Sequence, residues 1–149
     1  MEDYEINEQT LAVISLNNKK SKIFESSDVF IVNKPAIKIM EDSCQFFGSS
    51  LSGRQKGTTS LIGVSHKAPI IIEESREIIF FPTLSPRKNA CSWISLKNIE
   101  SYYNKNKSVF IKFKNNTQLE LNMSYGIIDN QILRATRLES VLRSRKNEK

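Results

Sequence analysis

Residues 109–121, VFIKFKNNTQLEL, decide the kind of fold that this chain adopts. Every second residue from Val109 to Phe113 is apolar, which is the period of a β-strand with one buried face. Asn115-Asn116 supplies a turn, and the alternation returns at Leu119 and Leu121. The stretch therefore predicts a β-hairpin that buries one side and carries lysines on the other.

Short runs rich in β-branched and aromatic residues predict further strands before this hairpin. Residues 35–39 fit either a strand or a single helical turn. Leu51–Lys56 fits either a short helix or a structured loop, because glycines punctuate it. The predicted strands are Tyr4–Ile6, Thr10–Ser15, Ser21–Glu25, Asp28–Val32, Ser60–Ser65, Pro69–Ile72 and Glu77–Phe81.

The C-terminal part of the chain has the pattern of an amphipathic helix. Its apolar residues recur at steps of three and four, and they are Ile128, Ile132, Ala135, Leu138 and Leu142. We expect a helix over residues 124–145 that packs on the sheet, with a dimer seam as the second choice. The whole pattern predicts an α+β, mainly β fold. It is a single domain over residues 1–149 with a mixed or antiparallel sheet and one long C-terminal helix.

Charge is distributed unevenly along the chain, which has a formal net charge of +6. Residues 1–42 hold 5 Lys and Arg against 8 Asp and Glu, whereas residues 43–119 hold 11 against 4. We therefore expect acidic N-terminal strands over residues 1–42 and a basic core over residues 43–122. This division suits a basic face turned to a polyanion; the alternative is a surface of lysines that are only solvated.

The basic core opens with residues 44–58, CQFFGSSLSGRQKGT, which contain no acidic residue. Small residues let the backbone approach a partner closely, and the cations of the segment can then reach a polyanion. We expect Phe46 and Phe47 to anchor the segment in the core. This combination is typical of a loop that contacts nucleic acid.

Two later segments, around Lys67 and around Arg87-Lys88, also place cations between small residues without an acid. His66 is either a phosphate contact or a satisfied, partly buried imidazole. The predicted DNA-contacting residues are Ser49, Ser50, Arg54, Lys56, His66, Lys67, Arg87 and Lys88.

Catalysis and metal binding find little support in the sequence. A nucleophilic triad or dyad would have to use His66, the single histidine, and no nucleophile elbow or protease cysteine signature surrounds Cys44 or Cys91. Structural zinc normally takes four ligands in paired spacing, which is not present. We expect no enzyme activity, no metal and no cofactor, and we interpret both cysteines as buried thiols.

The sequence shows no helix-turn-helix, because no helix with a short turn is expected before residue 127, and no zinc-finger or basic-zipper spacing. Loops bearing arginine and lysine fit a narrow minor groove, whose negative potential is deepest in A·T tracts. The alternative is a basic protein-interaction module that binds an acidic partner through an apolar docking patch. RNA binding is a third hypothesis and would require exposed aromatic rings.

Several blocks of the sequence occur together in a fixed order between Pro35 and Leu138. They are residues 44–58, VSHKAPIII at 64–72, FFPTLS at 80–85, CSWIS at 91–95, and Ser124-Tyr125 leading to Asn130-Gln131 and Arg134. In order and spacing these blocks resemble the signature of the bacterial competence transcription factor family, ComK.

The resemblance implies a sequence-specific activator of DNA-uptake genes that binds double-stranded DNA. It implies recognition of A-rich and T-rich boxes largely from the minor groove, by homodimers or higher assemblies that also meet RNA polymerase. It further implies control by an adaptor of a Clp-type protease, although family members often continue beyond the C-terminal helix, where part of that contact can lie.

We expect a cytoplasmic, nucleoid-associated protein that does not enter a membrane. The opening residues, MEDYEINEQT, are acidic and polar, unlike a signal peptide. No apolar run approaches the roughly 18 residues that span a bilayer.

Overall fold

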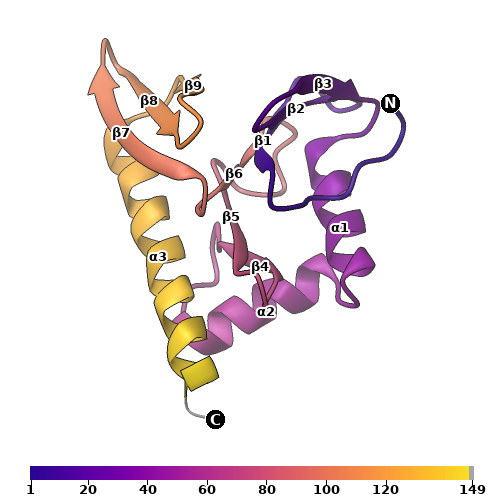
Figure 1. Cartoon of the computed structure of the whole chain (residues 1–149), viewed down its shortest axis with the longest axis vertical. Coiled ribbons are helices and arrows are strands. Elements are labelled where there is room, and N and C mark those ends of the chain that lie inside the picture. The colour runs from indigo at the N-terminus through magenta and orange to yellow at the C-terminus, as the bar shows by residue number, and fades with distance from the viewer. Residues whose placement is uncertain (148–149) are drawn as a thin grey trace.

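A six-stranded antiparallel sheet forms the centre of the molecule (Figure 1). The computed structural model describes residues 1–147. The strand order is β3-β2-β1-β6-β5-β4, and the predicted α+β, mainly β fold with antiparallel strands is confirmed. The strands are β1 (Thr10–Ser15), β2 (Ser21–Glu25), β3 (Val29–Val32), β4 (Ile70–Glu73), β5 (Ile78–Pro82) and β6 (Trp93–Ser95).

The middle strands of this sheet are buried on both faces. Successive side chains of a strand point to opposite faces, and β5 is buried at every position. Ile79 and Phe81 belong to one apolar cluster, whereas Ile78 and Phe80 belong to another. The sheet therefore separates two cores, and each core requires its own covering layer.

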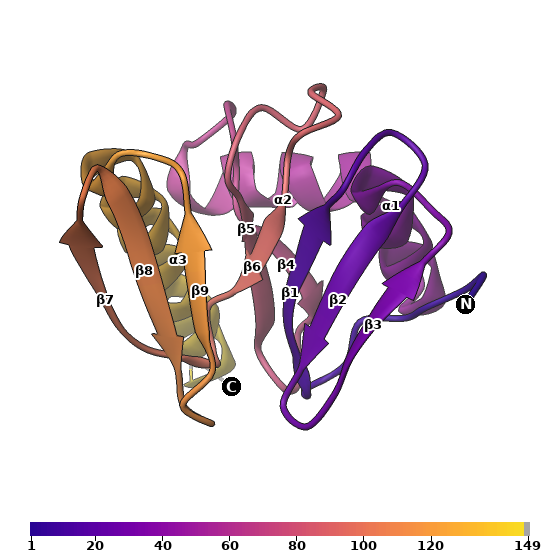
Figure 2. The ribbon, with the colours of Figure 1, turned by 90° about the horizontal axis from the view of Figure 1, so that it is seen from above.

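Helix α1 (Ala36–Phe46) and the start of α2 (Leu51–Ile62) cover one face of the sheet. Ile39 and Met40 of α1 join Phe80 and Trp93 in the core on that side. Helix α2 then passes the edge strand β4, and its end at Ile62 packs in the core on the other face. That other face is also covered by α3 (Tyr125–Asn147) together with a second sheet. Figure 2 shows α3 behind that smaller sheet, and Figure 1 shows the helix extending below it.

The smaller sheet has the strand order β7-β8-β9, with bounds Ile99–Lys105, Ser108–Phe113 and Gln118–Leu121. Strands β8 and β9 are the predicted hairpin, in which Val109 pairs with Leu121 and Ile111 with Leu119. The predicted C-terminal helix and its packing on the sheet are also confirmed, because its apolar stripe is buried in the same core as the hairpin. The buried residues of that stripe are Ile128, Ile132, Ala135, Leu138 and Leu142.

Residues 36–62 are more helical than the sequence predicts. Residues 44–58 run from the last turn of α1 into α2, and the predicted strand Ser60–Ser65 is wrong. Helix α2 continues to Ile62 and ends at Gly63, which adopts φ 73°. Glycine and β-branched residues lower helix propensity, but burial of one side of α2 against its neighbours outweighs that cost.

Helices α1 and α2 are joined by the short turn at residues 47–50, in which Gly48 has φ 83°. The expectation that no such helix pair precedes the C-terminal helix is wrong. Phe46, expected in the core, is 65% exposed, because the buried face of α1 is set by Ile39, Met40, Ser43 and Cys44. Phe47 is half-buried at the edge of that core.

Three further elements differ from expectation. Tyr4–Ile6 is not a strand, because its backbone turns to α1, where Ile6 donates to the Ser43 hydroxyl at 3.1 Å. Strands β6 and β7 were not predicted. β6 has only three residues, and β7 is mostly exposed, so neither shows a clear period.

Both cysteines are free and buried, as predicted, in the core beneath α1. Burial disfavours a thiolate, and it raises the pKa of Cys44 to about 11. Burial likewise raises the pKa of Cys91, whose sulfur donates to the Leu84 carbonyl at 3.3 Å.

We predict that both thiols of the native protein resist thiol–disulfide exchange at pH 8, because burial keeps them in the unreactive protonated form and shields them from the reagent. Reaction with a chromogenic disulfide reagent, followed with and without denaturant, measures this. Rapid native-state reaction at either cysteine would show that the core opens at α1.

Changing Leu138 to Ala should destabilise the protein by roughly 2–5 kcal/mol, because Leu138 is fully buried against the sheet and leaves a cavity. Chemical denaturation gives the difference in free energy of unfolding. Leu133→Ala, on the same helix but 58% exposed, is the matched control and should change stability little. Equal losses from the two changes would contradict the packing of α3.

Candidate nucleic-acid interface

Three chain connections meet at one end of the six-stranded sheet. They are the β1–β2 turn, the α2–β4 segment and the β5–β6 loop, at residues 16–20, 63–69 and 83–92. The register puts their flanking residues at the same end, since Ser15 pairs with Ser21 and Trp93 pairs with Pro82. In Figure 2 they project together along the upper edge of the molecule.

This end of the sheet is basic and has no carboxylate in its three connections. Lysines lie in the β1–β2 turn, Lys67 lies in the α2–β4 segment, and Arg87 and Lys88 lie in the β5–β6 loop. Their cations have no ion-pair partner within residues 1–147. We call the five residues Lys19, Lys20, Lys67, Arg87 and Lys88 the cationic end.

The opposite end of the same sheet carries paired charges. Arg76 Nη1 lies 3.5 Å from Glu8 Oε1, and Arg76 Nε lies 3.6 Å from Glu73 Oε2. Arg143 Nε of α3 lies 2.9 Å from Glu77 Oε2. The Arg143 guanidinium holds the pKa of the Glu77 carboxyl below its usual range. Cations at this end are therefore already compensated, whereas those at the cationic end are free to meet an external anion.

The α2–β4 segment is held in place by a buried amide of α3. Gln131 is almost fully buried, and its Nε2 donates to the Lys67 carbonyl at 2.9 Å and to the Pro82 carbonyl at 2.8 Å. The Arg134 guanidinium donates to the His66 carbonyl at 3.0 Å. These bonds fix the backbone of residues 66 and 67, where Lys67 adopts φ 52°.

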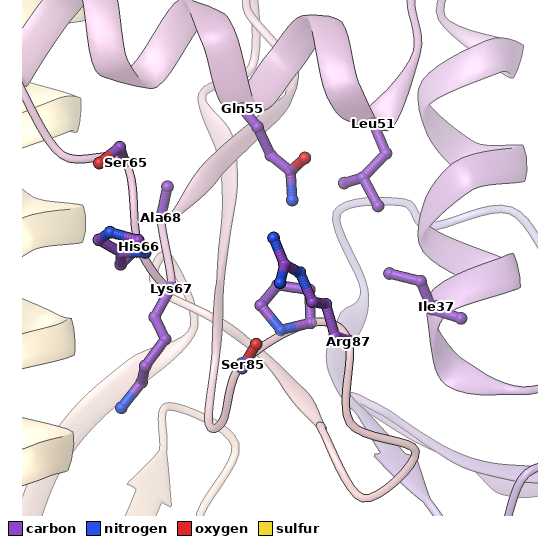
Figure 3. Close-up of a pocket in the computed structure, with 10 residues that line it drawn as sticks. Ile37, Leu51, Gln55, Ser65, His66, Lys67, Ala68, Ser85 and Arg87 are labelled. Atoms are coloured by element: carbon purple, nitrogen blue, oxygen red, sulfur yellow. The ribbon is translucent and has the colours of Figure 1, made fainter.

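Two adjoining hollows open beside this segment. The larger, of about 460 Å³, lies between α2 and the β5–β6 loop, and Figure 3 shows Arg87 reaching into it. The smaller, of about 380 Å³, lies between residues 66–67 and the first turns of α3. His66 and Lys67 line both hollows, so they form the ridge between them.

The structure brings together only part of the predicted site. His66, Lys67 and Arg87 border one hollow, and Lys88 follows Arg87 in the same loop. Lys56 is exposed on α2. Ser50 caps α2 by accepting from the Gly53 amide at 3.0 Å, and Ser49 precedes it in the turn.

Arg54 is separated from this group. Its side chain is 18% exposed and lies 3.2 Å from Glu74, in the β4–β5 turn at the opposite end of the sheet. The Arg54 guanidinium is thus engaged by a carboxylate, unlike that of Arg87.

Sequence reasoning missed four residues at this surface: Lys19, Lys20, Gln55 and Arg134. Lys19 and Lys20 belong to the acidic N-terminal part by composition, but Ser15 ties their turn to the β5–β6 loop through the Ser92 hydroxyl at 3.0 Å. The Asn17-Asn18 turn signal was the available clue. Gln55 and Arg134 lie in the blocks that carry the family resemblance, but no local pattern placed them at a contact surface, because that depends on which loops lie opposite them.

No group of three metal-ligating side chains occurs among the described residues. His66 is exposed in its loop, whereas Cys44 and Cys91 lie in the core, so the three residues do not share a ligand arrangement. Within residues 1–147, no helix has the length and apolar character required to cross a membrane.

Comparison with known proteins identifies the family. The model of the family described as ComK protein matches residues 1–147. The chain is 37% identical over 149 residues to the competence transcription factor of Bacillus subtilis (strain 168), an alignment that covers 97% of this chain and 78% of the relative. No solved structure matches. The chain therefore belongs to the ComK family.

Proposed function

We propose that this chain is a transcription regulator of competence genes that binds double-stranded DNA through its cationic end. The relative from Bacillus subtilis is named a competence transcription factor. The observation that carries the proposal is the group of five cations at the cationic end, none of which has an ion-pair partner within residues 1–147. Lys34, which follows β3 at the same end of the sheet, is paired with Asp3 and Asp42, and Arg76 and Arg143 at the opposite end are also paired with carboxylates. Unpaired cations around a hollowed surface attract a polyanion and release its counterions.

The placement of the aromatic side chains favours duplex DNA over single strands or RNA. Single-strand binders stack bases on exposed rings. Phe80, Phe81 and Trp93 are fully buried, and Tyr103 stacks on Phe110 in the smaller sheet rather than at the cationic end. Phe46 is exposed, but it packs on Phe47, whose ring lies beside Arg76 at the end of the sheet opposite the cationic end. The rival interaction module requires an apolar docking patch in place of the cations, and the two hollows are instead bordered by His66, Lys67 and Arg87.

We propose that A·T-rich boxes are read mainly from the minor groove by loop cations. Arg87 and Lys88 lie on a loop rather than on a helix, and a loop fits a groove that is too narrow for a helix. A·T tracts narrow the minor groove and concentrate its negative potential, which favours inserted arginine and lysine. We further propose that the protein assembles on DNA as a dimer or higher oligomer, contacts RNA polymerase and associates with the nucleoid. We also propose that an adaptor delivers it to a Clp-type protease.

Replacing Lys67, Arg87 and Lys88 together by Ala should weaken duplex binding and flatten its salt dependence. Each lost phosphate contact lowers the slope of log K against log salt by about 0.9. Titration of A·T-rich duplex at several salt concentrations, with the fold checked by circular dichroism, gives both quantities.

The matched control removes three positive charges from elsewhere, by changing Lys97, Lys114 and Arg143 to Ala. Lys97 and Arg143 are paired with Glu8 and Glu77, so this variant should keep most of the slope. The proposal fails if both triple variants lose affinity and slope equally, because binding would then follow net charge alone.

Replacing A·T pairs of a bound box by I·C pairs should be tolerated. This replacement changes the pattern of donors and acceptors in the major groove but leaves the minor-groove pattern nearly the same. Competition between A·T, I·C and G·C versions of one box measures the preference. Complete loss of binding on the I·C duplex would assign the readout to the major groove.

A further inference from the structure

The larger hollow receives polar side chains from two opposite walls. Gln55 extends into it from α2, and Arg87 extends into it from the β5–β6 loop, so that the amide and the guanidinium face one another (Figure 3). Ile37 and Leu51 lie on the side nearest α1, and Ala68 and Pro86 complete the apolar part of the lining. The hollow thus combines directed hydrogen-bond donors with a partly apolar lining.

The walls of this hollow are held by hydrogen bonds that do not involve Gln55 or Arg87. The Thr58 hydroxyl joins α2 to the Pro69 carbonyl at 2.6 Å, and the Thr59 hydroxyl joins α2 to the Val64 carbonyl at 2.9 Å. In the β5–β6 loop, the Lys88 amide donates to the Ser85 carbonyl at 2.9 Å. These bonds hold α2 to the α2–β4 segment and close the turn of the β5–β6 loop. Gln131 then links the α2–β4 segment to the end of β5, where that loop begins, through the Lys67 and Pro82 carbonyls.

The Arg87 guanidinium is not neutralised by any carboxylate of residues 1–147. Arg54 provides the internal comparison, since it lies on the same helix as Gln55 but is paired with Glu74. A guanidinium presents several donors in a fixed plane, and a primary amide adds two more. Donors converging from two sides on a space without an acid fit a phosphate oxygen better than they fit a cation or an apolar group.

We propose that this hollow is a phosphate subsite in which Arg87 and Gln55 hold one phosphodiester of the DNA backbone. The inference rests on the proposed function and adds a positional claim to it. The subsite fixes where one strand lies relative to α2, and phosphate contacts of this kind set the register of a protein on a duplex. His66 and Lys67 then border the path of that strand toward the smaller hollow.

The experiment neutralises one phosphate at a time, with methylphosphonate linkages placed along each strand of a bound duplex. For the unmodified protein we expect one position at which affinity drops roughly tenfold, the size of one charge-assisted hydrogen bond. The variants Arg87→Ala and Gln55→Ala should bind the unmodified duplex more weakly than the unmodified protein does. Placing a methylphosphonate at the sensitive linkage should then cost these variants little or no further affinity.

Lys56→Ala is the matched control, because Lys56 follows Gln55 on α2 but does not line the hollow. This variant should keep the drop at the same linkage, whatever its overall affinity. Gln55→Glu places a carboxylate against the phosphate and should bind more weakly than Gln55→Ala. If neutralisation at every linkage costs the Gln55 and Arg87 variants as much as the unmodified protein, the subsite is disproved.

Two further arms separate the sources of phosphate and the two proposals. The first arm measures whether inorganic phosphate raises the melting temperature of the unmodified protein and of Arg87→Ala. If phosphate stabilises only the unmodified protein, and the linkage scan shows no coupling to Arg87 or Gln55, the hollow binds a free anion. That result would overturn the backbone subsite. Absence of duplex binding by the unmodified protein would instead refute the proposed function itself.

Discussion

Burial of both faces of β4, β5 and β6 is the constraint on which the rest of the structure depends. Ile78 to Phe81 alternate between two cores, so neither face of the middle strands can be left to water. Helix α1 and the start of α2 cover one face, and α3, the end of α2 and the smaller sheet cover the other. Polar residues that bind a ligand are therefore excluded from the faces of the sheet and can lie only at the ends of its strands. Because neighbouring strands are antiparallel, successive connections alternate between those two ends, and the chain can give each end a different charge.

A single buried side chain connects this packing to the cationic end. Gln131 lies in the row of buried α3 residues, yet its amide reaches the carbonyls of Lys67 and Pro82. A buried amide without partners would destabilise the fold, and here its donors are satisfied by the α2–β4 segment and by the last residue of β5. The same bonds hold Lys67 in a left-handed backbone conformation that an L-residue rarely adopts. The helix that closes one core therefore also shapes the surface where the cations lie.

The parts of the fold with a strong local period were predictable from sequence. Apolar residues alternate along the β8–β9 hairpin, and they recur at steps of three and four along α3, so both elements can be recognised in the sequence. Helix α2 cannot be recognised in this way, because Gly53, Gly57 and two threonines lower its intrinsic helix propensity. Burial of Leu51, Thr58 and Ile62 stabilises it instead. Phe46 illustrates the same limit, since its exposure is decided by the face that α1 buries. At the site, composition identified Lys67, Arg87 and Lys88 but neither the lysines of the β1–β2 turn nor Gln55, whose proposed role depends on the loop opposite it.

Arg54 and Arg87 show why local sequence does not assign a contact residue. Arg54 follows a glycine, Arg87 follows a proline, and neither has an acid close by in the chain. Folding nevertheless places Glu74 beside Arg54, whereas no carboxylate of residues 1–147 pairs with Arg87. What distinguishes them is the end of the sheet that each one reaches. Unpaired like charges at the cationic end raise the free energy of the folded protein, and a bound polyanion lowers it again. The charge arrangement that we propose for DNA binding therefore also links binding to stability, since any ligand that prefers the folded state stabilises it.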